Sequence, residues 1–145
     1  MTRDINLVAQ LDPADADRLA VALGDEFGAD VDTLRTAIAR RGLFNVIHER
    51  AIVKVDFVVL KDTAYRLEEF GRRRLVEVDG HPFWIVAPED LIFSKLVWAS
   101  DSHSELQLRD VRGVLMQQKA TLDRAYLDQW AARLSVDGLL REVES

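Results

Sequence analysis

Three oxygen-bearing side chains have the types and spacing of a divalent-cation site. Asp4 and Asn6 lie two residues apart in a strand-like segment, so their side chains should project from one face of a sheet. Asp56 lies in a second strand-like run. If the two strands are neighbours, the three side chains converge, and Mg²⁺ prefers such oxygen ligands together with water and substrate phosphate. Two such ions polarise a phosphoryl group and activate an attacking hydroxyl.

The segment around Asp56 is predicted to be a strand with two unlike faces. Strand side chains alternate, so one face is apolar and the other carries Lys54 and Asp56 before it also becomes apolar. We therefore expect a sheet that is buried on both sides and open at one end. A buried carboxylate is costly without a partner. Asp56 is thus expected either in a metal site or in a salt bridge with Lys54, Lys95 or an arginine.

Strands and short helices should position these residues in the first part of the chain. The expected strands are Ile5–Gln10, Leu43–His48, Ala51–Leu60, Leu75–Val78 and Phe83–Val86. The expected helices begin at Asp12-Pro13, at Val31 and near Thr63. Asp79-Gly80 should form the turn of the last hairpin, because this dipeptide readily adopts positive φ angles.

From about residue 87 onward the pattern predicts helices only. Pro88, Glu89 and Asp90 are typical of a helix start, with carboxylates at the positive end of the helix dipole. Ser104 and Gln107 match a capping box for the next helix. Two further helices are expected, at 123–134 and 137–144. The sequence therefore predicts a single α+β domain over residues 1–145: a mixed β-sheet flanked by helices, with a C-terminal helical tail.

Composition is that of an ordinary globular protein. The 145 residues are 48% hydrophobic and 30% charged, and cysteine is absent, which excludes disulfides and thiolate metal sites. No apolar run approaches the roughly 18 residues that a membrane span needs. The first residues lack the basic start and apolar stretch of a signal peptide. We therefore expect a cytoplasmic protein with no membrane contact.

The net charge of −6 argues against strong nucleic-acid binding, which depends on phosphate neutralisation. Arg72, Arg73 and Arg74 form a local basic cluster. It is expected to be a solvated cluster between a helix and a strand, with a phosphate-binding patch as the alternative. The three histidines lie near turns and are expected to be exposed or capping. The three tryptophans, at positions 84, 98 and 130, are expected in the core.

Several segments resemble the polymerase β-type nucleotidyltransferase superfamily. Residues 2–8 are similar to its Asp-x-Asp strand, and residues 54–57 to its third-carboxylate strand. Residues 44–48, 87–96 and 104–115 are similar to small bacterial nucleotidyltransferase-like proteins related to abortive-infection toxins and minimal antitoxins. The order and spacing of these segments extend the resemblance over nearly the whole chain, and it implies a β-sheet of the nucleotidyltransferase type.

The resemblance implies roles for individual residues. Asp4, Asn6 and Asp56 would hold Mg²⁺, and Asp56 would be the catalytic carboxylate that helps activate the acceptor hydroxyl. Lys95 matches a helix lysine that lies near the site in such proteins. It would contact a phosphate of a nucleoside triphosphate, or pair with Glu105 or Asp110 on the next helix.

Two departures from the family pattern bear on activity. The second carboxylate of the Asp-x-Asp pair is Asn6, which offers an oxygen but no charge. The family also places a helix and a Gly-Ser turn before this strand, to hold phosphates by backbone N–H groups. Only three residues precede Asp4, so we expect that segment to be missing. Either the copy is degenerate, or the start site is placed too late. An uncovered strand would favour a homodimer or a partner protein.

Two functions are therefore expected for this protein. The first is a degenerate or truncated nucleotidyltransferase-like protein, serving as a toxin–antitoxin component or an oligomerising interaction module. The alternative is an active Mg²⁺-dependent nucleotidyltransferase that moves a nucleotidyl group from a nucleoside triphosphate to an RNA or protein hydroxyl.

Overall fold

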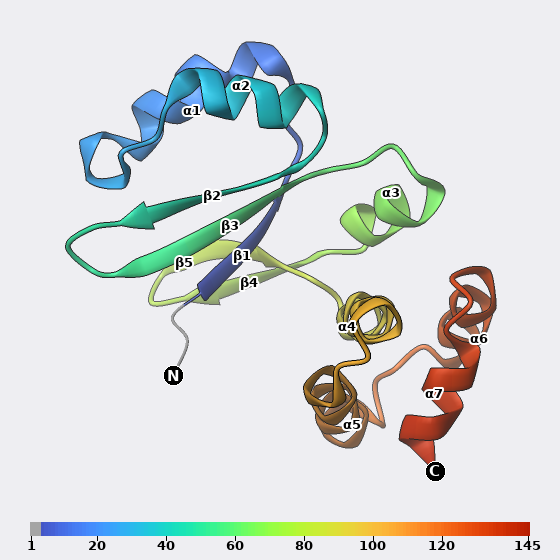
Figure 1. Cartoon of the computed structure of the whole chain (residues 1–145). Coiled ribbons are helices and arrows are strands. Elements are labelled where there is room, and N and C mark those ends of the chain that lie inside the picture. Colours follow the sequence, from blue (N-terminus) through green and yellow to red (C-terminus); the bar gives the residue numbers. More distant parts are fainter. Residues whose placement is uncertain (1–3) are drawn as a thin grey trace. The chain divides into compact units, whose positions relative to one another are not determined.

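The computed structural model describes residues 4–145, except for the side chain of Asp4. The chain has an α+β fold, as predicted, and it divides into two compact units (Figure 1). Unit 1, Met1–Leu67, contains a mixed sheet and its helices, and unit 2, Glu68–Ser145, contains a β-hairpin followed by helices. That residues 1–145 form one domain stays a prediction.

The sheet of unit 1 has three strands in the order β1-β3-β2. β1 (Asp4–Ala9) runs parallel to β3 (Val53–Val59), and β2 (Leu43–His48) runs antiparallel to it. β3 therefore lies in the centre. The condition on which the sequence prediction rested, that the strands of Asn6 and Asp56 are neighbours, is confirmed.

Helices cover one face of this sheet. α1 (Ala16–Leu23) and α2 (Val31–Ala39) lie over it together, and the short 3₁₀ turns η1 (Pro13–Asp15) and η2 (Asp25–Phe27) precede them. Asp12 caps η1 with a complete capping box, which confirms the predicted helix start. The buried core between helices and sheet consists of Ala16, Leu34, Ile38, Phe44, Val46, Val55, Phe57 and Val59.

The opposite face of the sheet is open within unit 1. Leu43, Asn45 and Ile47 of β2 lie on this face and are exposed. The prediction of a sheet buried on both sides is therefore wrong for unit 1. The physical reason is that the core of this unit forms on the Val55–Phe57 side alone, so its helices leave the other face without a covering layer.

Unit 2 begins within α3 (Ala64–Gly71), which leads into the predicted hairpin of β4 (Arg74–Val78) and β5 (His81–Ile85). The turn residues Asp79 and Gly80 have φ angles of 50° and 77°, as expected for this dipeptide. Every residue of β5 is exposed. The hairpin therefore contributes little to a core.

Four helices complete unit 2: α4 (Pro88–Ser102), α5 (Glu105–Gln118), α6 (Arg124–Arg133) and α7 (Asp137–Glu144). α4 contacts each of the other three, and its Ile92, Phe93 and Leu96 are fully buried. The predicted capping box at Ser104 is wrong, because the Ser104 side chain makes no capping hydrogen bond and Gln107 accepts one from Lys95 instead. None of the described helices is long and apolar enough to cross a membrane.

The three tryptophans all lie in unit 2, but only one belongs to its core. Trp130 is buried beside Tyr126, as predicted. Trp84 and Trp98 are 59% and 63% exposed, so the core prediction is wrong for both. Trp84 lies in the uncovered hairpin, where the Arg73 guanidinium stacks 4.6 Å from the centre of its ring. An apolar position in a strand pattern is thus no sign of burial when no layer packs on the strand.

Candidate functional site

The strand register places Asn6 directly beside Asp56. The two residues are partners in the parallel β1–β3 pairing. Partners in neighbouring strands project their side chains from the same face of a sheet. This is the face that the helices of unit 1 leave open. Two of the three predicted metal ligands are thus brought together as the sequence implied.

A third polar side chain, Asn45, continues the same row. Asn45 is the partner of Asp56 in the antiparallel β2–β3 pairing, so Asn6, Asp56 and Asn45 form one line across all three strands. We call these three residues the polar row. Asn45 lies in a segment that the family resemblance includes, but no role was predicted for it. The alignment of Asn45 with Asp56 depends on the register of the β2–β3 hairpin, which the sequence alone does not give.

The carboxylate of the polar row already has a cationic partner. The Lys54 ammonium lies 3.0 Å from an Asp56 carboxylate oxygen, and the Asp56 side chain is only 15% exposed. The salt-bridge alternative predicted for Asp56 is confirmed. The row contains two neutral amides and one carboxylate, and Lys54 balances the single charge. Within the described residues, no group of three His, Cys, Asp or Glu side chains has the arrangement of a metal site.

The first predicted ligand, Asp4, is only partly described. It is the first residue of β1, and its backbone lies opposite Lys54 in the register. Its side chain lies outside the described part of the chain, so its role as a metal ligand stays a prediction. As they stand, the described residues do not fit a dication, because their net charge is near zero.

Lys95, the predicted phosphate contact, lies on α4 in unit 2. Its ammonium is 2.7 Å from an Asp110 carboxylate oxygen and 3.2 Å from the Gln107 side-chain oxygen. The alternative prediction, pairing with Asp110 on the next helix, is confirmed. This ion pair joins α4 to α5, and it gives Lys95 a structural role. A phosphate contact by Lys95 stays a prediction.

A buried ionic network in unit 2 was missed by sequence reasoning. Glu89 and Asp90, at the start of α4, are 1% and 0% exposed. The Arg72 guanidinium bridges them, at 3.0 Å to Glu89 and 3.2 Å to Asp90. The Tyr126 hydroxyl donates to Asp90 over 2.7 Å, and the Asp123 backbone N–H donates to Glu89 over 2.8 Å. The network therefore ties α4 to the segment before β4 and to α6.

The Arg72–Arg74 cluster is consequently neither fully solvated nor free for phosphate. Arg72 is partly buried in the network, and its guanidinium lies 3.7 Å from the centre of the Tyr126 ring. Burial alone would lower the pKa of Arg72, but the hydrogen bond to Asp90 and the nearby negative charges raise it overall. Arg73 donates to the Phe70 carbonyl and stacks on Phe70 and Trp84. The predicted solvated cluster is therefore wrong for Arg72.

The network makes unit 2 sensitive to alkali. Burial, and then the hydrogen bond to Asp90, raise the pKa of Tyr126 above its ordinary value. The unfolded chain would lose this phenolic proton near pH 10, whereas the folded chain retains it. The folded state then binds more protons, so the free energy of unfolding should fall as the pH rises above about 10. Urea unfolding of wild type and Tyr126→Phe, followed from about pH 9 to pH 11 by tryptophan fluorescence, checks this. Parallel pH dependences in the two proteins would contradict it.

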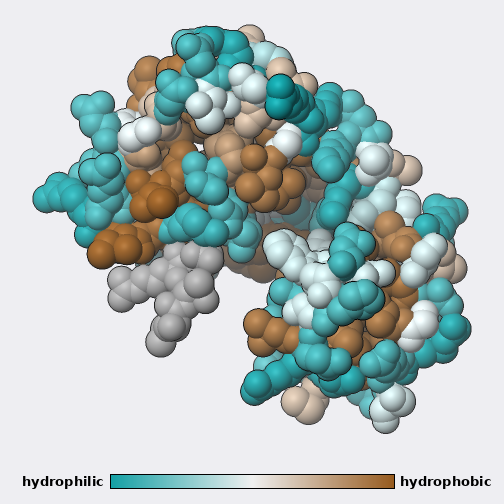
Figure 2. Space-filling model, in the orientation of Figure 1, coloured by the Kyte–Doolittle hydropathy of each residue, from teal (hydrophilic) through white to brown (hydrophobic). Residues whose placement is uncertain are grey.

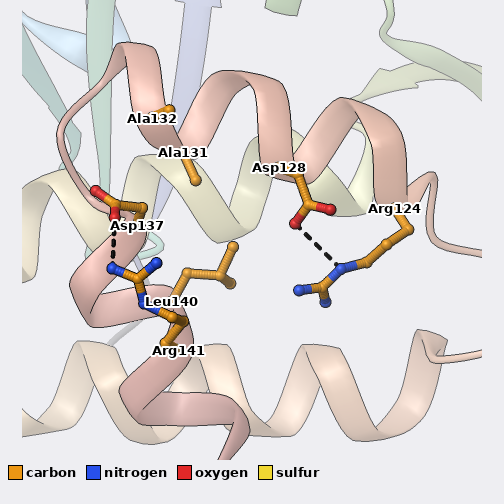
Figure 3. Close-up of a pocket in the computed structure, with 7 residues that line it drawn as sticks. All are labelled: Arg124, Asp128, Ala131, Ala132, Asp137, Leu140 and Arg141. Carbon is orange, nitrogen blue, oxygen red and sulfur yellow. Dashed lines mark hydrogen bonds and ion pairs between the residues drawn. The ribbon is translucent and has the colours of Figure 1, made fainter.

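The one pocket we describe lies between α6 and α7 and has a volume of about 330 Å³ (Figure 3). Arg124 and Arg141 line it, but Arg124 pairs with Glu144 and Asp128, and Arg141 pairs with Asp137. Both arginines are already paired with carboxylates, which makes the pocket a poor site for an anion. Of these ion pairs, Arg124–Glu144 joins the two helices, whereas Arg124–Asp128 lies within α6 and Arg141–Asp137 lies within α7.

The histidines behave as predicted. His48 bonds to the Glu26 carboxylate and accepts from the Ala51 N–H, which caps the β2–β3 turn. His81 and His103 are exposed, at the hairpin turn and at the end of α4. None of the three belongs to a described group of metal-ligating side chains.

No protein-family model, curated protein or solved structure matches this chain. The polar row and the strand register are therefore the observations on which a functional proposal must rest.

Proposed function

We propose that this chain is a degenerate nucleotidyltransferase-like protein that acts in the cytoplasm as a non-catalytic interaction module, such as a toxin–antitoxin component. The observation that carries the proposal is the ion pair at the polar row: the Lys54 ammonium lies 3.0 Å from the Asp56 carboxylate. A lysine thus supplies positive charge at the position where the family resemblance implies a Mg²⁺ ion.

Charge is the physical argument against catalysis. Two-metal transfer of a nucleotidyl group needs several carboxylates to hold the dications and their bound phosphates. In the polar row, Asn6 and Asn45 are neutral, and Asp56 is balanced by Lys54. A dication would have to displace an ammonium from a carboxylate that is mostly buried. Its binding there should be weak.

A second function has one observation in its favour. Asn6, Asp56 and Asn45 present side-chain oxygens in a single line on an open sheet face, and oxygen is the ligand that Mg²⁺ prefers. The alternative is therefore an active Mg²⁺-dependent nucleotidyltransferase that acts on a nucleoside triphosphate and an RNA or protein hydroxyl. The experiment must distinguish this enzyme from the non-catalytic module.

Titration calorimetry with Mg²⁺–ATP and Mg²⁺–GTP separates the two functions. We expect no saturable heat from folded wild type. The double variant Asn6→Asp/Lys54→Met makes the polar row more negative by two charges, so it should bind Mg²⁺–nucleotide saturably, about tenfold or more tightly than the limit that the wild-type titration sets. Adding Asp56→Asn should abolish the gain. Asn6→Asp/Lys61→Met is the matched control, because Lys61 is an exposed lysine beyond the end of β3.

The outcomes are distinct. If wild type binds Mg²⁺–nucleotide saturably and Asp56→Ala removes that binding, the chain retains a nucleotide site and the non-catalytic proposal fails. If the double variant gains nothing over its Lys61 control, the Lys54–Asp56 ion pair is not what suppresses metal binding. Far-UV circular dichroism of each variant establishes that the protein tested is folded.

A further inference from the structure

We infer that the outer edge of β1 is a dimer interface at which a second copy of this chain pairs antiparallel, centred on Leu7. The inference rests on the proposed function and names the partner of the interaction module. Its product is one sheet of six strands that runs through both copies. The partner is identified by the backbone and side-chain pattern of β1 itself.

The backbone of β1 has free hydrogen-bonding groups on one side. The Ala9 carbonyl accepts from the Leu60 N–H, so the polar groups of Ala9, Leu7 and Ile5 point toward β3. Those of Asn6 and Val8 point the other way, because direction alternates along a strand. None of the described residues pairs with that outer edge. Asn6 and Val8 thus present two N–H donors and two carbonyl acceptors to a partner.

The other edge strand, β2, has its end covered in a way that β1 does not. Beside β2, the Glu49 N–H donates to the Glu26 carbonyl of η2, and the His48 ring packs edge-on against Phe27 at 4.9 Å. Along β1, residues 5–9 contain no charge and no proline. Natural sheets usually protect an open edge with charged residues or proline. The absence of both from β1 indicates an edge that pairs with another strand.

The β1 sequence complements itself in one antiparallel register. Centred on Leu7, this register places Asn6 opposite Val8 of the second copy and Val8 opposite Asn6 of the second copy. The two pairs exchange four backbone hydrogen bonds. Asp4 then lies opposite Gln10, so no like charges meet, whereas a parallel pairing in register would place the two Asp4 residues side by side. A closed two-fold dimer follows directly from this arrangement.

Apolar side chains support the same register. Ile5 and Leu7 lie on the helix-covered face, yet they are 49% and 42% exposed, because the helical layer ends before it reaches β1. In the dimer, Leu7 meets Leu7 of the second copy, and Ile5 meets Ala9. Figure 2 shows apolar surface (brown) among hydrophilic side chains on the part of the molecule that Figure 1 draws as this sheet. Pairing would remove apolar side chains of β1 from water.

Single-cysteine variants test both the pairing and its register. The chain contains no cysteine, so any cross-link is unambiguous. Leu7→Cys should form a disulfide-linked dimer with oxidised glutathione, because facing residues of a non-hydrogen-bonded pair have Cα atoms about 4.5 Å apart, within disulfide reach. Ile5→Cys should not, since its copies would be roughly 13 Å apart. Val21→Cys, on the exposed side of α1, measures cross-linking by random collision.

Sedimentation velocity of unmodified wild type provides a second measurement. We expect a monomer–dimer equilibrium that shifts toward dimer with concentration. Val8→Pro should be monomeric, because it removes an outward N–H without touching a β1–β3 hydrogen bond. Val8→Thr, which keeps the N–H and the β-branch, should dimerise like wild type. Circular dichroism establishes that the proline variant is folded.

Three results would overturn the inference: folded wild type that stays monomeric at all concentrations, Ile5→Cys cross-linking as fast as Leu7→Cys, or a folded Val8→Pro variant that still dimerises. The test is independent of nucleotide binding. A dimer that binds Mg²⁺–nucleotide would refute the proposed function but not this interface. A monomer that binds no Mg²⁺–nucleotide would refute this interface but not the absence of catalysis.

Discussion

Replacing Arg72 with methionine is expected to lower the free energy of unfolding of unit 2 by about 3–5 kcal/mol. Methionine retains an apolar stem but removes the guanidinium, which lies 3.7 Å from the centre of the Tyr126 ring and bridges the two carboxylates. Glu89 and Asp90, 1% and 0% exposed, would lose the cation that lies 3.0 Å and 3.2 Å from them. The Tyr126 hydroxyl and the Asp123 N–H supply hydrogen bonds but no charge, and the Arg74 guanidinium, 3.9 Å from the Glu89 carboxylate, lies beyond hydrogen-bonding distance.

Tryptophan fluorescence during urea unfolding is the appropriate measurement, because all three tryptophans belong to unit 2. Arg73→Met is the control. Arg73 stacks on Phe70 and Trp84 without touching the buried carboxylates, so its loss should cost about 1 kcal/mol or less. The triple variant Arg72→Met/Glu89→Gln/Asp90→Asn should recover much of the loss, since it removes the unpaired charges. Equal costs for Arg72→Met and Arg73→Met would show that the arginine does not hold the network together.

Phe57→Ala is expected to lower the free energy of unfolding of unit 1 by about 3–5 kcal/mol. Phe57 lies on the central strand, is buried, and stacks on Phe44 with ring centres 4.9 Å apart and planes 7° apart. Alanine would leave a cavity beneath α2, where Leu34 and Ile38 complete the core.

Hydrogen exchange measured by mass spectrometry localises this effect. This method is needed because unit 1 has no tryptophan to report on its unfolding. Peptides from β1, β2 and β3 should lose protection from exchange in Phe57→Ala. Val21→Ala is the control, with an expected change within about 0.5 kcal/mol, since Val21 is exposed on α1. Unchanged protection in the strand peptides of Phe57→Ala would mean that the aromatic stack is not the centre of the core.

Local patterns predicted the elements of this fold well. The alternation around Asp56, the Asp12-Pro13 start and the Asp79-Gly80 turn are each decided by a few neighbouring residues, and the structure has all three. The α+β class follows from them. Whether a strand is covered is not a local property. Trp84 has the pattern of a core residue and yet is exposed, because it lies in a strand without a buried residue and its ring contacts the Arg73 guanidinium instead of a core.

The candidate site was only half predictable for the same reason. That the strands of Asn6 and Asp56 are neighbours was a condition that the sequence left open, and the place of Asn45 depends on the β2–β3 register. That register is set by a turn in which Ile52 adopts a φ of 50°, an uncommon angle for a β-branched residue. Glu89 and Asp90 likewise resembled ordinary first-turn residues of a helix. Their burial depends on Arg72 and Tyr126, which are distant in sequence.

The parallel pairing of β1 with β3 also has a consequence for how the chain folds. Asn6 pairs with Asp56 across fifty positions of sequence, whereas β2 and β3 are joined by a short turn. Closing the long loop costs more chain entropy than closing the turn, so the hairpin should form first and β1 should dock last. Until it docks, the inner edge of β3 is open to any other strand. A β1 from a neighbouring copy fits that gap as well as the chain's own, so refolding at high concentration should favour strand-exchanged species.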